Sequence, residues 1–261
     1  MSTGIEPATR DELMTVVASR MLRDGDVVFV GIGAPSTAAN LARLSHAPGL
    51  VLIYESGTIQ TEPDVLPLSI GDPELCQTAL ATVSVPEMFA YWLQGGRITK
   101  GFLGGAQVDR FANINSTVIG DYHDPKVRLP GAGGAPEIAS HCRETLIIAS
   151  HSKRTFVEQV DFVTSIGFGR GPGDRERAGV TTRGPVLVIT DLCLMEPDPG
   201  TCELVVTSLH AGVSAEEVRA NTGWGVRFVA DTPTTPEPSP DELRVLRDLR
   251  ERSDAAWAEP R

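Results

Sequence analysis

Leu50-Val51-Leu52-Ile53-Tyr54-Glu55-Ser56-Gly57 is the most informative segment of this sequence. Five apolar or aromatic residues run without a break and are followed by a carboxylate, a small residue and a glycine. A short continuous apolar run followed by turn residues is typical of a strand buried on both faces. Glu55 is therefore predicted to lie where this strand leaves its sheet, at the carboxyl edge that binds ligands in open α/β sheets. Gly57 permits a sharp turn there and the close approach of a ligand.

Glu55 also has a plainer interpretation, as the first polar residue after a strand, solvated in a loop as most glutamates are. Three further acids follow at Glu62, Asp64 and Asp72. They could supply a second carboxylate for acid–base chemistry, although solvated loop acids are the plainer expectation. The residues by themselves leave the role of Glu55 open.

The composition is that of a soluble globular protein. Of 261 residues, 41% are hydrophobic and 22% are charged, which suffices for a sizeable core in one large or two small domains. Lys and Arg number 23 against 34 Asp and Glu, and the resulting net charge of −11 argues against a nucleic-acid or anionic-membrane surface. The first residues lack a secretory signal and no apolar run approaches the ~20 residues of a membrane span, so a cytoplasmic protein is expected.

The spacing of cysteine and histidine predicts no metal site. The four cysteines show no CxxC spacing, and no two of the five histidines have metal-ligand spacing. Cys193 and Cys202 could face each other across a hairpin, but free thiols are expected in a chain of this size.

Helical and strand-like segments alternate along the chain, which predicts an α/β fold with an open, mostly parallel sheet flanked by helices. Residues 1–261 are expected to form a single domain, with 232–261 as a Pro-rich linker and a C-terminal helix. An ordered loop is predicted over 58–72, and a mobile excursion over 167–184. Helices are predicted at 9–23, 37–44, 85–93, 136–141, 215–221 and 240–257, and strands at 26–32, 50–54, 145–150, 155–160, 185–190, 193–195 and 204–208.

Two glycine-rich turns precede predicted helices and offer backbone N–H groups. The first, Gly31-Ile-Gly33-Ala-Pro-Ser36, lacks the third glycine of a dinucleotide fingerprint, so a tight turn into a helix is favoured. The second contains Gly131, Gly133 and Gly134, and no GK[ST] follows, which excludes a P-loop. Three glycines before a helix form a nest suited to an oxyanion or phosphate, so a functional role is favoured for this turn.

A dense polar set comes after the glycine pair Gly104-Gly105. Such a set can be a hydrogen-bonded turn, or it can offer amide donors and acceptors to a polar ligand. We expect mixed use, with Asp109 and Arg110 holding the turn and with Gln107 and Asn113 near the ligand. The set consists of Gln107, Asp109, Arg110, Asn113 and Asn115.

Several stretches together resemble the β subunit of the class I coenzyme A transferases. They are YESG (54–57), LPLSIGD (66–72), GGAQVDRFANINSTVIGDY (104–122), LPGAGGAPEIA (129–139), ITDLCLMEPD (189–198) and VTSLHAGV (206–213). The resemblance spans roughly residues 12 to 255 and is strongest toward the second subunit of the two-subunit 3-oxoadipate transferases, themselves similar to glutaconate CoA-transferase. Each motif is modest alone, and their order and number identify the family.

The resemblance implies roles for particular residues. Glu55 matches the family's catalytic glutamate, and the run of Gly131, Gly133 and Gly134 is similar to the loop whose backbone amides hold the thioester oxygen of acyl-CoA. No metal is expected. The substrate contacts expected from the block of motifs are Ser56, Gly57, Gln107 and Asn113.

Four positions depart from the family pattern. Tyr54 stands where many relatives carry Ser, and Gln60 and Ala112 replace usual glycines. Ala135 stands where some relatives carry Phe. The expected nucleophile is untouched by these departures, and what they put in doubt is the choice of acyl group.

The chemistry that the resemblance implies fits a glutamate, because an ionised carboxylate needs no partner base to attack an acyl-CoA thioester. CoA leaves as a thiolate and returns to the glutamyl carbonyl, which gives a glutamyl-CoA thioester on Glu55 and ping-pong kinetics. The expected reaction moves CoA from succinyl-CoA to 3-oxoadipate in the β-ketoadipate pathway of aromatic catabolism. CoA thioester is expected as a substrate and no cofactor as a permanent ligand. A CoA-transferase α subunit is the expected partner, in a hetero-oligomer such as α2β2 that keeps water from the thioester.

Other functions remain open at this stage. A glutaconate-type or other dicarboxylate CoA-transferase uses the same chemistry on a different acid. A CoA-thioester or ring-cleaving hydrolase would keep the fold, and a non-catalytic scaffold subunit would keep activity without Glu55. A sugar-phosphate isomerase on a related fold would need an acid–base set that the sequence does not offer.

Overall fold

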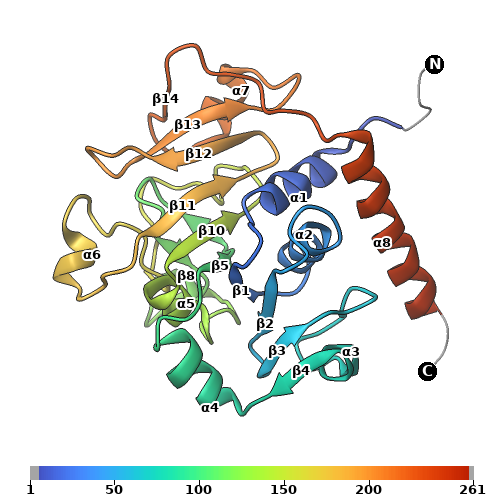
Figure 1. Cartoon of the computed structure of the whole chain (residues 1–261). Coiled ribbons are helices and arrows are strands. Elements are labelled where there is room, and N and C mark those ends of the chain that lie inside the picture. The colour runs from blue at the N-terminus through green and yellow to red at the C-terminus, as the bar shows by residue number, and fades with distance from the viewer. Residues whose placement is uncertain (1–5, 259–261) are drawn as a thin grey trace. The chain divides into compact units, whose positions relative to one another are not determined.

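The computed structural model describes residues 6–258, which group into two compact units. The first contains residues 6–88 and 236–258, and the second contains Phe89–Thr235. Strands and helices alternate in each unit, so the predicted α/β class is confirmed (Figure 1). The single domain expected for 1–261 stays a prediction.

The first unit contains the strand that ends at Glu55. Its strands have the order β1-β2-β3-β4, with β1 (Val27–Val30) parallel to β2 (Val51–Tyr54). β3 (Thr58–Thr61) pairs antiparallel with both β2 and β4 (Ala79–Thr82). The last three residues of β1 and of β2 are buried, so the strand predicted over 50–54 is confirmed as a buried one.

Helices of the first unit meet in a small apolar cluster formed by Val16, Leu41 and Leu246. These residues belong to α1 (Arg10–Arg20), α2 (Ala34–Arg43) and α8 (Pro240–Ala258), respectively. Thr9 and Glu12 form a capping box that starts α1 and satisfies backbone N–H groups left free at its first turn. The remaining helices of this unit are α3 (Pro73–Gln77) and α4 (Val85–Glu87).

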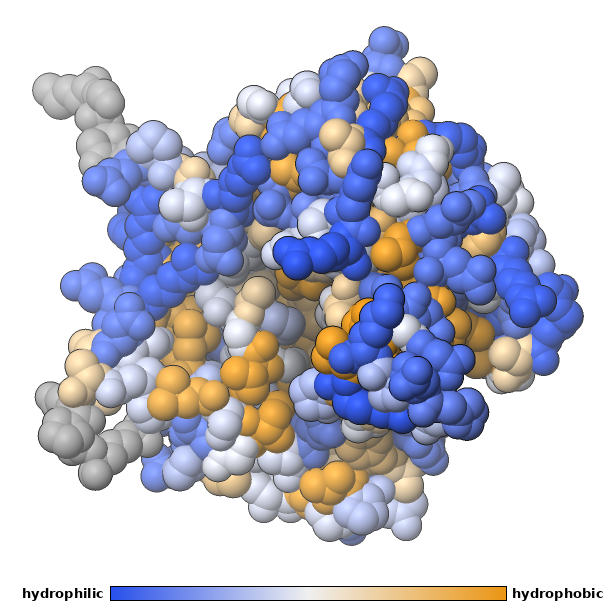
Figure 2. Space-filling model, turned by 180° about the vertical axis from the view of Figure 1, so that it is seen from behind, coloured by the Kyte–Doolittle hydropathy of each residue, from blue (hydrophilic) through white to orange (hydrophobic). Residues whose placement is uncertain are grey.

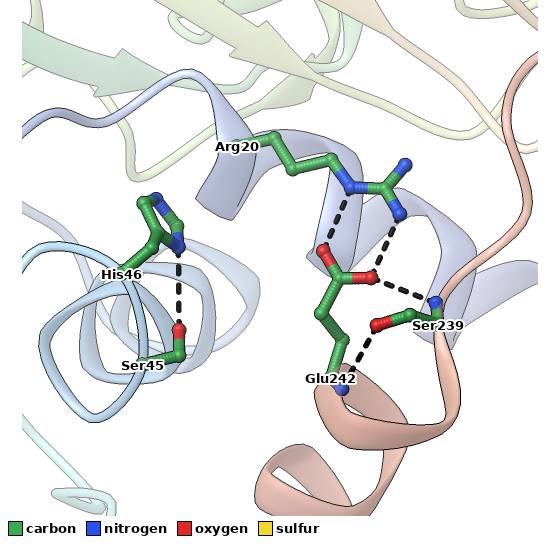
Figure 3. Close-up of a pocket in the computed structure, with 5 residues that line it drawn as sticks. All are labelled: Arg20, Ser45, His46, Ser239 and Glu242. Atoms are coloured by element: carbon green, nitrogen blue, oxygen red, sulfur yellow. Dashed lines mark hydrogen bonds and ion pairs between the residues drawn. The ribbon is translucent and has the colours of Figure 1, made fainter.

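The C-terminal helix predicted over 240–257 is confirmed as α8, and ion pairs join it to α1. Arg20 Nη2 lies 2.7 Å from Glu242 Oε2 (Figure 3), and Arg247 Nε lies 2.7 Å from Glu12 Oε1. Ser239 begins this helix by donating its backbone N–H to Glu242. Charged pairs and the apolar cluster therefore fix α8 within the first unit.

The Glu12–Arg247 pair makes the stability of the protein depend on pH. Hydrogen bonds from Arg247 lower the pKa of Glu12 from 4.5 to about 2. Because the pKa is lower in the folded state, the stabilisation is complete above pH 4.5 and is lost as the pH falls toward 2. We expect Glu12→Gln to lower the free energy of unfolding at pH 7, and this deficit to shrink between about pH 4.5 and pH 2 in urea titrations.

Glutamine keeps the shape of the side chain and the bond from the Thr9 N–H, so the variant isolates the charge. Glu251→Gln, at an exposed position on α8, is the matched control and should leave stability unchanged at every pH. A deficit of Glu12→Gln that is independent of pH would contradict the role of this ion pair.

The second unit has the strand order β14-β13-β12-β11-β10-β5. β5 (Lys100–Leu103), β10 (Glu144–Ile148) and β11 (Gly184–Ile189) are parallel neighbours. β12 (Cys193–Pro197) and β13 (Leu204–Leu209) add antiparallel pairs, and β14 (Arg227–Phe228) runs parallel to β13. The strands predicted over 145–150 and 185–208 are therefore confirmed. Shorter elements of this unit are β6 (Gln107–Val108), β7 (Ile114–Asn115), β8 (Val118–Gly120), β9 (Pro125–Arg128), α5 (Ala135–His141), α6 (Asp174–Arg177) and α7 (Ala215–Asn221).

Three local predictions are wrong. Residues 58–72 contain β3 and do not form a simple loop, because Gly57 turns the chain back along β2. Residues 85–93 form α4 followed by a π-helix over Met88–Leu93, not one α-helix. Residues 155–160 make only an isolated bridge, and their apolar pattern reflects the burial of Phe156, whose ring stacks on that of His151.

The segment 167–184, predicted to be a mobile excursion, is anchored by Arg175. This residue is 4% exposed, and its guanidinium donates to the carbonyl oxygens of Ile166, Gly167 and Ala139 and to Thr182. Burial lowers the pKa of this arginine. A buried, fully hydrogen-bonded arginine holds both ends of the segment in place.

The surface shown in Figure 2 is mainly hydrophilic, with separate hydrophobic patches. Leu80, on β4, is 74% exposed and Leu68 is 64% exposed. None of the helices formed by residues 6–258 has the length and apolar character that crossing a membrane requires.

Candidate functional site

Glu55 lies in the three-residue turn of the β2–β3 hairpin. The N–H of Gly57 donates to the carbonyl oxygen of Tyr54 at 3.0 Å, and Ile53 pairs with Ile59 across the hairpin. Gly57 has φ +101°, which side chains other than hydrogen rarely tolerate. A Cβ at this position would lie 2.0 Å from the carbonyl oxygen of Val83. The sharp turn predicted at Gly57 is confirmed, and the close approach there is made by the chain's own backbone.

Tyr54 anchors this hairpin to α2. Its Oη lies 2.8 Å from Ser36 Oγ, and both residues are almost fully buried. Burial raises the pKa of Tyr54, so the phenol stays neutral and keeps this bond at physiological pH. Asn40, one turn further along α2, donates to the carbonyl oxygen of Ser36. The residue directly before Glu55 is therefore held by a buried polar contact.

The turn at Gly31–Ser36 has the geometry of a tight entry into a helix. Gly33 is the N-cap of α2 with φ +82°, Pro35 lies in the first turn, and the hydroxyl of Ser36 contacts Tyr54. This agrees with the interpretation as a structural turn.

Of the acids that come after Glu55, Asp72 has a defined structural role. It is 6% exposed and accepts hydrogen bonds from the N–H groups of Glu74 and Leu68, as the N-cap of α3. Glu74 in turn accepts a hydrogen bond from the N–H of Asp64. Asp72 therefore has a capping role in place of the solvated position expected for it.

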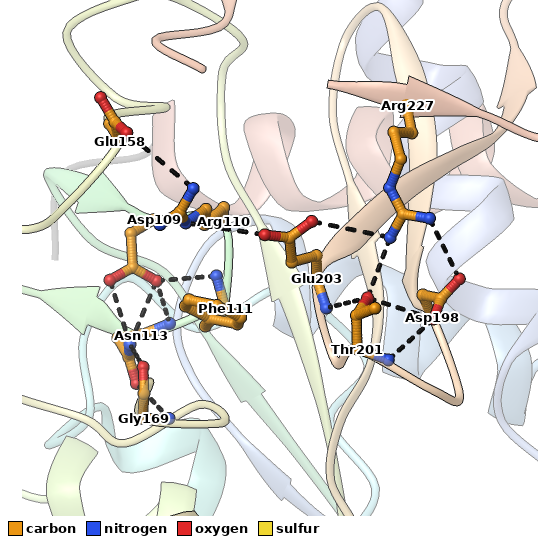
Figure 4. Close-up of polar contacts among 10 residues, drawn as sticks. All are labelled: Asp109, Arg110, Phe111, Asn113, Glu158, Gly169, Asp198, Thr201, Glu203 and Arg227. Carbon is orange, nitrogen blue, oxygen red and sulfur yellow. Dashed lines mark hydrogen bonds and ion pairs between the residues drawn. The ribbon is translucent and has the colours of Figure 1, made fainter. Parts of the chain in front are cut away.

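Asp109 and Asn113 clamp a loop of the second unit (Figure 4). Asn113 donates to both carboxylate oxygens of Asp109 and to the carbonyl oxygen of Gly169, and its own oxygen accepts the N–H groups of Gly167 and Gly169. Burial raises the pKa of Asp109. Arg110, beside this clamp, lies within 4 Å of Glu158 and Glu203. The structural roles expected for Asp109 and Arg110 agree with these contacts.

Gln107 and Asn113, predicted to contact substrate, are both engaged inside the protein. Gln107 donates to Asp161 and accepts from Asn115 and from the backbone N–H of Asp161. The side-chain oxygen and nitrogen of Asn113 are both used in the clamp with Asp109. A substrate contact stays a prediction for both, and at Asn113 it would require one of these bonds to break.

The glycine nest splits into two parts. Gly131 is fixed to Ser116, to which it donates its N–H at 3.0 Å and from whose hydroxyl it accepts a hydrogen bond at 2.7 Å. Gly134 is the N-cap of α5. Within the part of the chain that the structure describes, no hydrogen bond uses the N–H of Gly133 or Gly134. These two N–H groups therefore remain the candidate donors.

Two cavities are lined by residues other than those predicted from the sequence. One, of about 430 Å³, lies around Arg20, Ser45, His46, Ser239 and Glu242 in the first unit (Figure 3). The other, of about 460 Å³, is lined by residues 178–182 with Gln94 and His141. Between residues 6 and 258, no three His, Cys, Asp or Glu side chains gather as a metal site would require, and all four cysteines are free thiols.

Sequence reasoning missed the hydroxyl of Thr58, which is the first residue of β3 and is 1% exposed. It also missed a buried network in which His151 contacts Thr190 and Thr222. Burial lowers the pKa of His151 to about 4, so its ring is neutral at pH 7. The only available signal for Thr58 was a polar residue at the start of a strand directly after the glycine of the turn.

Comparison with known proteins places these features in a wider group. Residues 12–221 match the family model described as coenzyme A transferase. The second subunit (B) of the 3-oxoadipate CoA-transferase of Pseudomonas knackmussii is 59% identical over 246 residues, covering 94% of this chain and 95% of the relative. The second subunit (B) of the glutaconate CoA-transferase of Acidaminococcus fermentans is 36% identical, covering 92% of this chain and 91% of the relative. The crystal structure of glutaconate coenzyme A-transferase from the same organism has a TM-score of 0.87 at 34% identity, over 93% of this chain and 94% of that one.

Proposed function

Because the chain belongs to the coenzyme A transferase family, we propose that it is the β subunit of an enzyme that moves CoA from succinyl-CoA to 3-oxoadipate. The observation that carries this proposal is the position of Glu55, in a rigid turn at the end of a buried strand, within a chain 59% identical to a 3-oxoadipate CoA-transferase subunit. Glutaconate or another dicarboxylate as the acceptor acid is the alternative that the 36% identical relative supports.

The first half of the proposed reaction takes CoA from its donor. A carboxylate oxygen of Glu55 attacks the carbonyl carbon of succinyl-CoA, the carbon–sulfur bond breaks, and CoA leaves as a thiolate. The thiolate then attacks the side-chain carbonyl carbon of Glu55 in the resulting anhydride. The anhydride carbon–oxygen bond on that side breaks, succinate departs, and CoA remains on Glu55 as a thioester.

The second half runs these steps in reverse with the acceptor acid. A carboxylate oxygen of 3-oxoadipate attacks the Glu55 thioester and expels the thiolate, which then attacks the acyl carbon of the acceptor. Glu55 is regenerated as a carboxylate and 3-oxoadipyl-CoA leaves. The coenzyme enters and departs as a substrate, so the scheme needs no permanently bound cofactor.

Oxyanions form at each attack and need fixed donors. The N–H groups of Gly133 and Gly134 are the proposed donors to the substrate's oxygen, since no bond among residues 6–258 uses them. Gly131 shapes the nest through its bonds to Ser116. Loss of one oxyanion donor typically costs about 2.7–4 kcal/mol of transition-state stabilisation. Ser56, Gly57, Gln107 and Asn113 stay as proposed substrate contacts.

A CoA-transferase α subunit is the proposed partner. Both relatives carry the letter of the second subunit of their enzymes, which supports a first subunit for this chain as well. On this chain, Leu80 projects 74% exposed from β4, and Leu68 is 64% exposed, which is the kind of apolar surface a permanent partner covers. A partner subunit would also keep water from a hydrolysable thioester. The mass of the purified assembly measures how many copies of each subunit it contains.

The test is to trap the thioester in the complex purified with its α subunit. Incubation with succinyl-CoA should add the mass of CoA less one water to the peptide that contains Glu55, and borohydride should reduce this group to an alcohol. Adding 3-oxoadipate should discharge it and yield 3-oxoadipyl-CoA. An unmodified Glu55 during turnover would overturn the proposal, and release of free acid without CoA transfer would indicate a hydrolase.

A further inference from the structure

Two hydroxyl groups next to Glu55 are buried without a hydrogen-bond partner among residues 6–258. They are Ser56 Oγ and Thr58 Oγ1, which flank Gly57. The Thr58 side chain belongs to a residue that is only 1% exposed. A buried hydroxyl that makes no hydrogen bond costs about 1–3 kcal/mol, so it requires an explanation beyond folding.

Other threonines of the same unit do find partners. Thr15 and Thr78 donate to carbonyl oxygens one helical turn back, and Thr61, on the same strand as Thr58, donates to the carbonyl oxygen of Leu75. Valine has nearly the same shape as threonine and is at least as favourable in a strand. The fold therefore gives no reason for a hydroxyl at position 58.

The hairpin fixes where this hydroxyl lies in the chain. Ile53 pairs with Ile59, and continuing the register by one residue places Thr58 opposite Tyr54. Tyr54 is bound to Ser36, so the base of the turn is held from both strands. Glu55 comes directly after Tyr54 and precedes Thr58 by three residues, and its side chain is long enough to fold back over so short a turn.

We propose that Thr58, assisted by Ser56, donates a hydrogen bond to the side-chain carbonyl oxygen of Glu55 when the CoA thiolate attacks it. This inference rests on the proposed function. In that step a sulfur–carbon bond forms and the carbonyl electron pair moves onto the Glu55 oxygen. The pair returns as the bond to the departing carboxylate breaks. A neutral hydroxyl donates to the oxygen throughout and most strongly while it carries the full charge.

This assignment separates two oxyanions that the reaction requires. One forms on the carbonyl carbon of the substrate, for which Gly133 and Gly134 are the proposed donors. The other forms on Glu55 itself and needs donors next to that side chain. The unpartnered hydroxyls of Ser56 and Thr58 meet this requirement because they belong to the same turn.

The experiment compares Thr58→Val and Thr58→Ser in the complex with the α subunit. Thr58→Val should slow formation of the Glu55 thioester by roughly 10- to 100-fold in rapid-quench mass spectrometry, with little change in the KM for succinyl-CoA. Thr58→Ser keeps the hydroxyl and should restore most of the rate. Both variants should unfold at or near the wild-type temperature, because valine removes only an unpaired hydroxyl.

Thr145→Val is the matched control. Thr145 lies on β10, is 1% exposed, and its hydroxyl also has no partner among residues 6–258, so it tests the effect of removing such a group elsewhere. This variant should form the thioester at the wild-type rate. If Thr58→Val also does so while the wild-type enzyme carries CoA on Glu55, this inference is wrong and the proposed function stands. A wild-type enzyme that forms no thioester overturns both.

Discussion

Replacing Glu55 by glutamine is expected to reduce CoA transfer by roughly 10⁴-fold or more, because an amide cannot act as the nucleophile that carries CoA. Glutamine has the size and shape of glutamate, and the turn is held by the Gly57 N–H and the Tyr54 hydroxyl, so the hairpin should keep its structure. The thioester on this peptide should disappear altogether. Stopped assays of succinyl-CoA consumption and intact-mass spectra of the complex measure the two effects.

Glu62→Gln is the matched control for this substitution. Glu62 lies just after β3 in the same unit and is exposed, so its loss should leave the transfer rate within about twofold of wild type. Circular dichroism and the mass of the assembled complex should be unchanged in both variants. If Glu55→Gln keeps a substantial rate, the chain is a scaffold subunit and another residue performs the chemistry.

The strand that ends at Glu55 could be predicted from sequence because burial on both faces requires an unbroken apolar run. The observed strand Val51–Tyr54 lies within the predicted one. The next segment was less predictable, since the turn at Gly57 also serves β3, a strand with three polar residues in four. Those threonines and Gln60 carry no apolar alternation, and only pairing with β2 and β4 makes the segment a strand.

The Gly-, Arg- and Asp-rich segment at 167–184 shows a second limit of sequence reasoning. Composition alone indicates an excursion from the fold. Arg175 reverses this interpretation because its guanidinium meets four acceptor residues in the interior, the farthest of which, Ala139, lies 36 residues away in sequence. A contact set by distant carbonyl groups leaves no local pattern to find.

Two departures from the family pattern proved physically informative. Gln60 and Ala112 replace glycines usual in related sequences, and both have positive φ, of 49° and 58°. Positive φ is a conformation that glycine adopts at little cost and other residues at about 1–2 kcal/mol. The backbone has therefore kept a glycine-like shape after the side chains changed, which explains why these departures leave the turn carrying Glu55 intact.

The supporting turn itself should be far less tolerant of change than Glu55. Gly57→Ala is expected to lower the free energy of unfolding by roughly 2–5 kcal/mol, because alanine must adopt φ +101° and its Cβ would lie 2.0 Å from the carbonyl oxygen of Val83. Relief of that clash would separate β3 from Val83 and shift the turn. A shift of about 1 Å in a nucleophile can cost on the order of 10²-fold in rate, so transfer should fall in the folded fraction as well.

Gly25→Ala separates the two causes. Gly25 also has positive φ, at 81°, but no atom lies within 4 Å of the position its Cβ would take. Its variant should lose only about 1 kcal/mol and keep full activity, since it bears the conformational strain without the clash. Urea unfolding of both variants, with transfer rates measured at about 10 °C to keep them folded, gives the comparison. Equal losses of stability would show that Val83 moves aside freely, and Glu55 would then owe its position to Tyr54 and Ser36 alone.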